Sequence, residues 1–403
     1  MDLDLFDHRS PGALVPITGT DPERGTWSHS AFVPDPLQEI VPVLTPRTYL
    51  AVANARAALA ALDSTAQHLP NPSLLRQPSL RTEAQSTSAL EGTYAPLAAV
   101  LTADEERPES ADLREVLNYV SMADDAFDWV QEGRGLTVSL LGALQRRLVA
   151  GTRSEGSATG GVRDWQVVVG RRADAIEDDL PVVAARFVPP PGGLDLAARL
   201  QDLLDWMGSP QNDDMDPVVA AALAHYQFET LHPFGDGNGR IGRLLIVIHL
   251  LRLGVLDEPT LTVSPWFEER RERYYDHLLS VSTEGGWDAF VRFFATGLKA
   301  SATTTRVQML ALVDVQSRLH ERVRGSRLRA DTAHALVDFA VGHTSFTVRA
   351  VARDLGISYA RANSLVEQLV RLDVLAPLDG SDSYRRRFLA PAVLEVLVRA
   401  GSR

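Results

Sequence analysis

A glycine-rich segment between two apolar helical patterns constrains this sequence more than any other feature. The segment LHPFGDGNGRIGRLL, residues 231–245, places three glycines within five residues. PVVAAALAHYQFETL precedes it and RIGRLLIVIHLLRLG overlaps its end, and both carry apolar residues at helical spacing. An ordered glycine costs more chain entropy than any other residue, so the three glycines need a reason. The sequence therefore predicts a helix, a loop and a helix, with the loop either a tight structural turn or a site for an anion.

The surroundings of this loop argue against the common nucleotide-binding loops. A dinucleotide-binding glycine loop follows a strand, whereas this loop follows a helical pattern. Lys299 is the single lysine of the chain and follows no glycine-rich loop, so a P-loop is absent. The sequence also argues against an EF-hand, because Asp236 and Asn238 are not followed by the acid that completes such a calcium site.

Two arginines favour the anion site over the plain turn. Arg240 and Arg243 fall in the first turn of the second helix, where a cation opposes the helix dipole at a cost of about 0.3–1 kcal/mol. Their i, i+3 spacing puts them on one face, and the N–H groups of a helix N-terminus attract anions. Asp236 offers a hard oxygen to Mg²⁺, and His232 could accept a proton from a hydroxyl at neutral pH. Each residue alone also has a structural explanation, such as a packed histidine, but their combination favours a phosphate site.

The order of these residues resembles a known signature. Residues 232–243, HPFGDGNGRIGR, are similar to the complete motif of Fic-domain proteins, His-Pro-Phe-x-Asp/Glu-Gly-Asn-Gly-Arg-x-x-Arg. REVLNYV and the hairpin region that ends in RFVPPP, both before the motif, and RYYDHLL after it also resemble family elements in family order. The resemblance therefore covers roughly residues 30–300. It implies transfer of AMP from ATP to a Ser, Thr or Tyr hydroxyl of a target protein. Related phosphotransferase toxins carry lysine at the position of Gly239, which favours AMP transfer here; another nucleotide such as UMP is the alternative.

The resemblance also implies roles within the site. It makes His232 the catalytic base, Asp236 the ligand of Mg²⁺, and Arg240 and Arg243 the groups that hold the β- and γ-phosphates of ATP. The remaining expected members of the ATP-binding loop are Phe234 as a buried anchor, Gly235, and Gly237, Asn238 and Gly239 around the α-phosphate.

Two further segments are expected near this site. The run of Val167, Val168 and Val169 predicts a small β-hairpin, which is either a flap that holds the target protein by strand addition or a hairpin without a binding role. Tyr274 and Tyr275 either line the adenine pocket or belong to the core of an amphipathic helix.

The upstream segment TEAQSTSALEGT carries a second resemblance. Thr87, Glu91 and Gly92 match the family's inhibitory motif, Ser/Thr-x-x-x-Glu-Gly/Asn, which places the chain near the subclass with an N-terminal inhibitory helix. The simpler alternative is a helix that ends at a glycine. A carboxylate at that end opposes the helix dipole, which favours a cationic partner. We expect Glu91 to pair with Arg243, and so to occupy the group that the γ-phosphate of ATP needs.

Apolar stripes along the chain predict a mainly α fold: a Fic-type helical core with a small β-hairpin flap and a C-terminal winged helix-turn-helix domain. Within it, residues 1–45 are proline-rich and are expected to form an irregular arm, followed by a helix over residues 48–64. The expected ranges are an N-terminal arm and helices including the inhibitory helix (1–110), the catalytic core (111–300), a helical linker (301–325) and the winged-helix domain (326–403).

The C-terminal region supports a rival function. Residues 326–403 predict helix, turn and helix, with the turn at 356–358, and then a strand pair with Gly380 in its loop. This region carries 11 arginines against 8 acidic residues, a net charge of +3, although the whole chain has a net charge of −12. SYARANSLVEQLVRL would be the recognition helix, with the arginines at 385–387 near the wing. A DNA-binding regulator with a secondary Fic core is therefore the alternative function, although many winged helices bind protein instead.

The composition gives no sign of export or membrane insertion. The chain has no cysteine, its acidic N-terminus lacks the order of a signal peptide, and its most apolar run is too short to span a bilayer. We expect a cytoplasmic protein with no membrane partner. Its expected partners are a target protein, the chain itself through automodification, and DNA or protein at the winged helix. The oligomeric state stays open, with a homodimer that controls the inhibition as one alternative.

Overall fold

The computed structural model describes residues 1–67, 76–104, 107–209, 215–326, 328, 331–378 and 386–400. The chain forms two compact units whose segments alternate along the sequence. The first comprises Met1–Ala57, Ser121–Val255 and Trp266–Lys299, and the second comprises Ala58–Val120, Leu256–Pro265 and Ala300–Arg403. The division into the ranges 1–110, 111–300, 301–325 and 326–403, expected from the sequence, stays a prediction.

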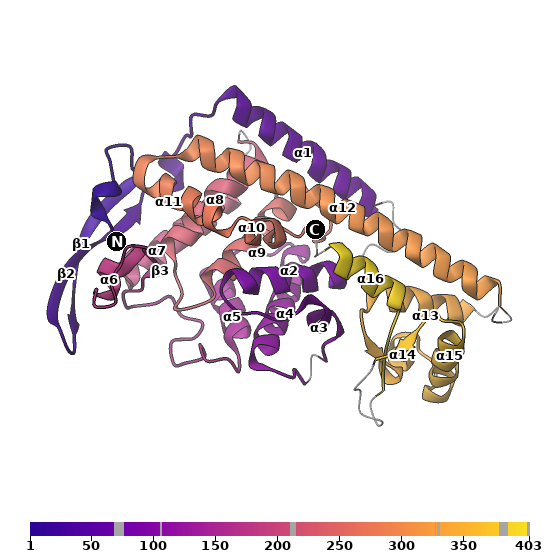
Figure 1. Ribbon diagram of the computed structural model, residues 1–403. Coiled ribbons are helices and arrows are strands. Elements are labelled where there is room, and N and C mark those ends of the chain that lie inside the picture. The colour runs from indigo at the N-terminus through magenta and orange to yellow at the C-terminus, as the bar shows by residue number, and fades with distance from the viewer. Residues whose placement is uncertain are drawn as a thin grey trace. The chain divides into compact units, whose positions relative to one another are not determined.

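Helices dominate both units (Figure 1). The α-helices are α1 (Pro46–Gln67), α2 (Arg76–Leu90), α3 (Leu97–Thr102), α4 (Ala111–Gln131), α5 (Val138–Val149), α6 (Pro181–Ala184), α7 (Leu194–Gly208), α8 (Pro217–Leu231), α9 (Asn238–Arg252), α10 (Ser264–Glu268), α11 (Arg271–Glu284), α12 (Trp287–Arg324), α13 (Asp331–Gly342), α14 (Val348–Asp354), α15 (Tyr359–Arg371) and α16 (Pro391–Ala400). In the described part of the chain, antiparallel sheets pair β1 (Gly12–Asp21) with β2 (Gly25–Pro34), β3 (Val169–Arg171) with β4 (Ala185–Phe187), and β7 (Arg387–Leu389) with both β5 (Phe346–Thr347) and β6 (Ala376–Pro377). The expectation of a mainly α fold with small hairpins is confirmed.

The predicted helices are present with shifted ends. The helix expected over residues 48–64 is α1, and the helix expected to stop near Gly92 is α2, which ends at Leu90. The expected linker over residues 301–325 is the second part of α12, a continuous helix of 38 residues. No helix within the described ranges combines the length and the apolar character that crossing a membrane requires.

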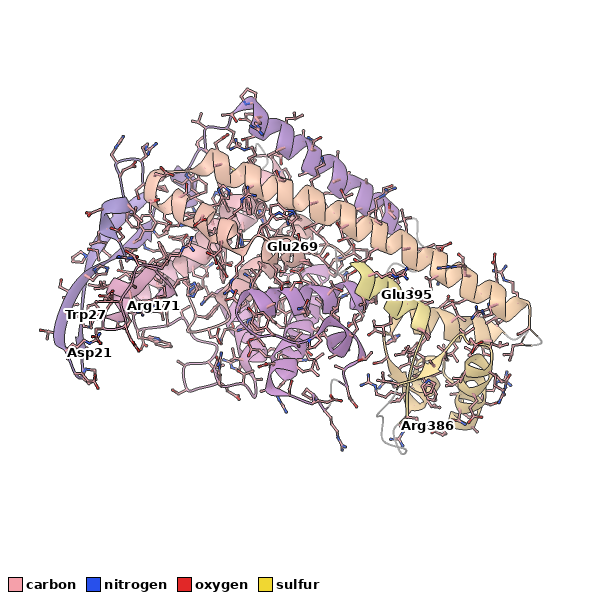
Figure 2. All side chains as sticks on the ribbon, viewed as in Figure 1. Asp21, Trp27, Arg171, Glu269, Arg386 and Glu395 are labelled. Carbon is pink, nitrogen blue, oxygen red and sulfur yellow. The ribbon has the colours of Figure 1, made fainter. Side chains whose placement is uncertain are left out.

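The N-terminal arm is a regular hairpin, so the prediction of an irregular arm over residues 1–45 was wrong. β1 and β2 pair along their whole length, from Gly12 opposite Pro34 to Asp21 opposite Gly25. Gly25 has φ +79°, the left-handed conformation that closes three-residue hairpin loops. Figure 2 labels Asp21 at this turn and Trp27 on β2. Pro16 argued against a strand here, because proline cannot donate a hydrogen bond within a sheet. Each strand of a two-stranded sheet is an edge strand, however, where proline is tolerated.

β3 and β4 form the small hairpin that the sequence predicted. Val169 lies opposite Phe187 in this pair. Val167 and Val168 precede the strand, because the paired segment runs on from Val169 into the glycine and arginine that follow it. The role of this hairpin as a flap for a target protein stays a prediction.

α8 and α9 flank the glycine loop and pack against each other in the first unit (Figure 1). Nearly all of their side chains are buried, as expected for helices that are apolar around their circumference. Gly242 permits this close packing: a Cβ there would lie 2.3 Å from Oε1 of Glu229 and 3.1 Å from Cδ1 of Phe228. The glycine outside the loop therefore serves the packing of the two helices.

The C-terminal region has the element order expected from its sequence. α13, β5, α14, α15, β6 and β7 follow one another, and the three strands lie in the order β5-β7-β6. Gly356 has φ +62° between α14 and α15, and Ser358 caps α15 by accepting from the N–H of Arg361 (3.3 Å). Gly380 and Arg385 lie outside the described residues. The assignment of this region as a winged helix stays a prediction.

Within the second unit, the C-terminal region is anchored on α3. Carbonyl oxygens at the end of this helix accept hydrogen bonds from side chains of that region. The pairs are Thr344 Oγ1 to Leu101, Ser345 Oγ to Thr102 (3.1 Å) and Arg387 Nη2 to Ala103 (2.8 Å). The short helix that follows the predicted inhibitory motif is thus bonded to side chains of the C-terminal region.

Candidate active site

The glycine loop begins where α8 ends in an unusual backbone conformation. At the start of α8, Asp216 accepts from the N–H of Val218 (2.8 Å) and Pro217 occupies the first turn. At its end, His232 adopts φ 48° and ψ 59°, while its N–H still donates to the carbonyl oxygen of Phe228 (3.0 Å). Left-handed residues other than glycine are uncommon and concentrate at functional sites. The chain therefore turns sharply at the residue expected to be the base.

The imidazole of His232 is held in one tautomer. Its Nδ1 lies 3.3 Å from the carbonyl oxygen of Glu229, which is one turn earlier in α8. A carbonyl oxygen only accepts hydrogen bonds, so Nδ1 carries the proton of the neutral ring and Nε2 carries the lone pair. Nε2 is therefore the basic atom, as removal of a proton from an incoming hydroxyl requires.

Two of the loop glycines have a structural reason. Gly237 has φ +87°, and a Cβ there would also lie 2.7 Å from the side chain of Leu148. A Cβ at Gly235 would lie 2.8 Å from the ring of Trp165. The plain-turn explanation accounts for these positions, but it does not account for the arginines that follow.

Asn238 closes the loop onto Phe234. The N–H of Phe234 donates to Oδ1 of Asn238 (2.9 Å), and Nδ2 of Asn238 donates to the carbonyl oxygen of Phe234 (2.8 Å). Phe234 is fully buried, in the place expected of an anchor. The Asn238 amide thus supports the loop, and its expected contact with an α-phosphate, like that of Gly239, stays a prediction.

The start of α9 is a cationic helix N-terminus. Gly237 stands at the N-cap position and has no side chain to accept from the first N–H groups of the helix. Arg240 follows in the first turn of the helix and Arg243 in the second, and each is only 1% exposed. Two buried guanidinium groups at the positive end of a helix dipole attract an anion. The position therefore favours an anion site over a plain turn.

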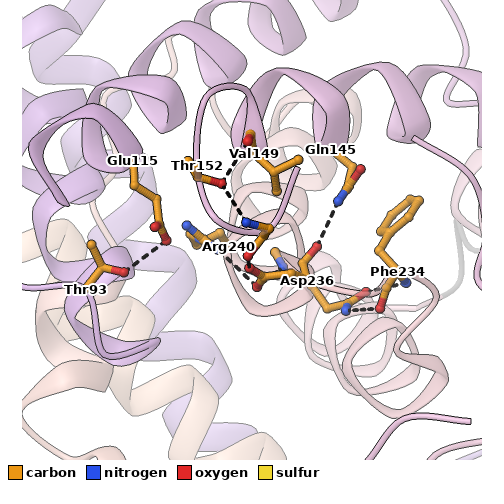
Figure 3. A network of polar contacts seen from close by, with 11 residues as sticks. Thr93, Glu115, Gln145, Val149, Thr152, Phe234, Asp236 and Arg240 are labelled. Atoms are coloured by element: carbon orange, nitrogen blue, oxygen red, sulfur yellow. Dashed lines mark hydrogen bonds and ion pairs between the residues drawn. The ribbon is translucent and has the colours of Figure 1, made fainter. Parts of the chain in front are cut away.

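Asp236 is held in place from three sides (Figure 3). Its Oδ1 accepts from the N–H of Gly237 (2.6 Å) and lies 3.2 Å from Nη2 of Arg240, while Oδ2 accepts from Oγ of Ser154. Its carbonyl oxygen accepts from Nε2 of Gln145 (3.2 Å). Ser154 and Gln145 could not be predicted from the sequence, because they lie more than eighty residues upstream and no spacing pattern links them to the loop.

The carboxylate of Asp236 fits the role of a Mg²⁺ ligand. Its side chain is 42% exposed, and Mg²⁺ takes one or two carboxylates together with phosphate oxygens and water. The described residues contain no group of three or more His, Cys, Asp or Glu that could hold a metal ion by itself. A Mg²⁺ ion at Asp236 would therefore take its other ligands from a bound triphosphate and from water, and it would compete with Arg240 for Oδ1.

Tyr274 lies in the core of the first unit. It is fully buried, and its hydroxyl lies 2.7 Å from Nε2 of His225, whose Nδ1 lies 3.1 Å from the carbonyl oxygen of Gly242. Burial lowers the pKa of His225 to about 3, so this histidine is neutral and donates from Nδ1 to the carbonyl. The position of Tyr274 favours the core alternative. Tyr275 is half-buried, and its role at the adenine stays a prediction.

The predicted inhibitory motif lies at the end of α2. Thr87 is fully buried, whereas Glu91 is exposed directly after the last helical residue. Gly92 has φ +90° and donates from its N–H to the carbonyl oxygen of Ala89 (3.0 Å), and the N–H of Thr93 donates to that of Ser88 (3.0 Å). These two bonds form a Schellman motif, which explains the glycine without a regulatory role. The expected Glu91–Arg243 pair joins residues of different units and stays a prediction.

The fold and the loop together define a helical protein with a cationic site at a helix N-terminus. Residues 49–128 match the family model "Fic/DOC family N-terminal", and residues 135–250 match the model "Fic/DOC family". The chain therefore contains the two domains that these Fic/DOC family models describe.

Individual relatives agree with these matches. Over 106 residues the chain is 42% identical to the protein adenylyltransferase Fic of Drosophila willistoni and to that of Drosophila mojavensis. Each match covers 26% of this chain and 20% of the relative. The chain thus spans about a fifth of the length of these curated relatives. The crystal structure of a Fic family protein from Desulfovibrio desulfuricans G20 matches 87% of this chain and 98% of its own, with a TM-score of 0.52 and 23% identity. This likeness shows a shared fold.

Proposed function

We propose that the chain is a cytoplasmic enzyme that transfers AMP from ATP to a Ser, Thr or Tyr hydroxyl of a target protein, itself included. The observation that carries the proposal is the site around the start of α9. There Arg240 and Arg243 are buried in the first two turns of the helix, and the preceding loop begins at His232, whose Nδ1 lies 3.3 Å from the carbonyl oxygen of Glu229. The names of the Drosophila relatives, protein adenylyltransferase Fic, support the same reaction.

The geometry suits an in-line transfer at the α-phosphate. The target hydroxyl gives its proton to Nε2 of His232 while its oxygen forms a bond to the α-phosphorus, and the bond to the β-phosphate oxygen breaks to release pyrophosphate. Arg240 and Arg243 hold the β- and γ-phosphates, and the N–H groups at the start of α9 stabilise charge on the transferred group. Mg²⁺ held by Asp236 would neutralise charge on the same phosphates. Catalysis then consists mostly of positioning and charge stabilisation.

The position of a radioactive label in ATP tests this orientation. Incubation with ATP labelled at the α-phosphate should transfer label to protein, whereas ATP labelled at the γ-phosphate should transfer none, because pyrophosphate leaves with that label. Autoradiography of the wild type and of Glu91→Gly measures both. Label from the γ-position would contradict the proposal, and preferential labelling by α-labelled UTP would favour the UMP alternative.

We further propose that Glu91 inhibits this reaction. A carboxylate paired with Arg243 would withdraw the guanidinium that the γ-phosphate needs, and ATP would then bind in an unproductive position. Thr87, four residues earlier and buried in α2, would orient that end of the helix.

A DNA-binding regulator is the alternative function, and one observation favours it. Arg386 lies beside α15, where its Nη2 is 3.4 Å from Oδ1 of Asn363, and Tyr359 at the start of this helix is 58% exposed. If α15 binds DNA, a gel-shift assay with the full chain should detect a complex that weakens steeply as salt rises from 50 to about 200 mM. Arg386→Ala should weaken it further, because one phosphate contact is lost. No complex at low salt would remove this alternative.

A further inference from the structure

Arg163 is a buried arginine that forms no ion pair with a carboxylate among the described residues. Its side chain is 0% exposed, and its hydrogen bonds in the described part of the chain go to backbone carbonyl oxygens. The donor pairs are Nε to His232 (2.8 Å), Nη1 to Trp165 (2.8 Å), Nη2 to Pro190 (2.7 Å) and Nη2 to Leu231 (3.3 Å). Burial lowers the pKa of Arg163 to about 10, so the side chain keeps its charge at neutral pH.

These carbonyls come from both ends of the β3–β4 hairpin and from the end of α8. Trp165 precedes β3 and Pro190 follows β4, whereas Leu231 and His232 close α8. A planar guanidinium can satisfy several acceptors in fixed directions at once, which an ammonium group cannot do. Arg163 thereby fixes the entry and exit of the hairpin against the carbonyl of His232.

The backbone of Arg163 strengthens the same junction. Its N–H donates to the carbonyl oxygen of Pro233 (2.9 Å), and its own carbonyl oxygen accepts from the N–H of Gly193 (2.9 Å). Gly192 allows the two hairpin ends to approach closely, since a Cβ there would lie 2.6 Å from the carbonyl carbon of Asp164. The two ends of the hairpin and the turn at His232 therefore form one connected backbone structure.

We propose that Arg163 is a positioning residue for the base. It holds His232 in its left-handed conformation and fixes the position of the β3–β4 hairpin relative to Nε2 of His232. A cation at the C-terminus of α8 is favoured by the helix dipole, and hydrogen bonds from a charged donor are stronger than neutral ones. A left-handed backbone conformation costs free energy in a residue other than glycine. It persists only where contacts with the surrounding structure hold it in place. The link to transfer rests on the proposed function, whereas the conformation of His232 does not.

The test uses Arg163→Lys, which keeps the charge and loses the planar fork, and Arg163→Met, which keeps the length and loses every donor. Gln166→Met is the matched control: Nε2 of Gln166 donates to the carbonyl oxygens of Val167 (2.9 Å) and Pro189 (2.9 Å), so it joins the same hairpin ends without bonding His232. Circular dichroism identifies the folded variants, and Arg163→Lys decides if Arg163→Met does not fold.

The first readout is the ring ¹⁵N spectrum of His232 in the full chain, assigned by its loss in His232→Asn. In the wild type it should report a neutral ring protonated at Nδ1. Arg163→Lys should move it toward a mixture of tautomers, and Gln166→Met should leave it unchanged. A wild-type ring protonated at Nε2, or a spectrum identical in the wild type and folded Arg163→Lys, would overturn the proposal.

The second readout is the kinetics of AMP transfer. Arg163→Lys should lower kcat by about 100-fold, because small misplacements of a reacting group have effects of this size, and KM for ATP should stay within about twofold, since the phosphates bind at α9. Equal effects on kcat and on ATP binding would show a merely structural role. If the wild type transfers no AMP, the proposed function is contradicted. The ring ¹⁵N spectrum still tests whether Arg163 positions His232.

Discussion

AMP transfer should fall by about 10²–10⁴-fold when His232 is replaced by asparagine, the range expected for loss of a general base. Asparagine tolerates the left-handed conformation of this position better than alanine does. The variant therefore keeps the turn between α8 and α9 and loses the imidazole. Incorporation of label from α-labelled ATP measures the rate, and calorimetry should find ATP binding nearly unchanged because the arginines of α9 remain.

The experiment is most sensitive in the Glu91→Gly background, where transfer is expected to be high. His8→Asn is the control, since His8 is exposed near the N-terminus and should have no effect. If His232→Asn reduced ATP affinity as much as it reduced the rate, His232 would be a structural part of the loop rather than the base.

Replacing Glu91 by glycine should raise AMP transfer, including self-modification, by about 5- to 150-fold, the range of a typical coupling free energy of 1–3 kcal/mol between two sites. The expected reason is release of Arg243 from the proposed pair with Glu91, so that it can hold the γ-phosphate. Glu91→Gln separates the charge from the backbone effect of glycine, and it should raise transfer as well, because a neutral amide pairs weakly with a guanidinium. Initial rates on an accepted target measure all variants.

The chain contains a matched control for this prediction at the end of α4. Glu132 occupies the same position of the same helix-ending motif: Gly133 has φ +73° and donates to the carbonyl oxygen of Val130 (2.9 Å), and the N–H of Arg134 donates to that of Trp129 (3.3 Å). Glu132→Gly should therefore leave transfer unchanged. Equal low activity of the wild type and Glu91→Gly, or an equal increase from Glu132→Gly, would contradict inhibition by Glu91.

The sequence predicted local features well, because short-range spacing encodes them. The apolar patterns placed α8 and α9, and the position of Arg240 and Arg243 at a helix start predicted a site for an anion. A second Glu-Gly pair, at residues 132–133, ends a helix in the same way as the pair at 91–92. A Glu-Gly pair alone therefore does not distinguish an ordinary helix end from an inhibitory motif.

Features that depend on distant segments could not be predicted. Ser154, Gln145 and Arg163 reach the loop from positions far upstream, and their side chains bond the loop residues in ways that no spacing records. The β1–β2 hairpin was missed because a proline stands within β1, and its regularity depends on pairing between two segments. Tyr274 carried two alternatives in the sequence, and only its contact with His225 distinguishes them.

The anchoring of the C-terminal region on α3 has a consequence for how the chain should be dissected. A truncation before residue 326, the obvious place to cut from the sequence, would remove Thr344, Ser345 and Arg387 and leave three carbonyl groups of α3 without their protein donors. Any change in enzyme activity after such a deletion would mix damage to α3 with loss of whatever the removed region binds. Single substitutions on the exposed face of α15 avoid that confusion and are the sounder tool for assigning a role to this region.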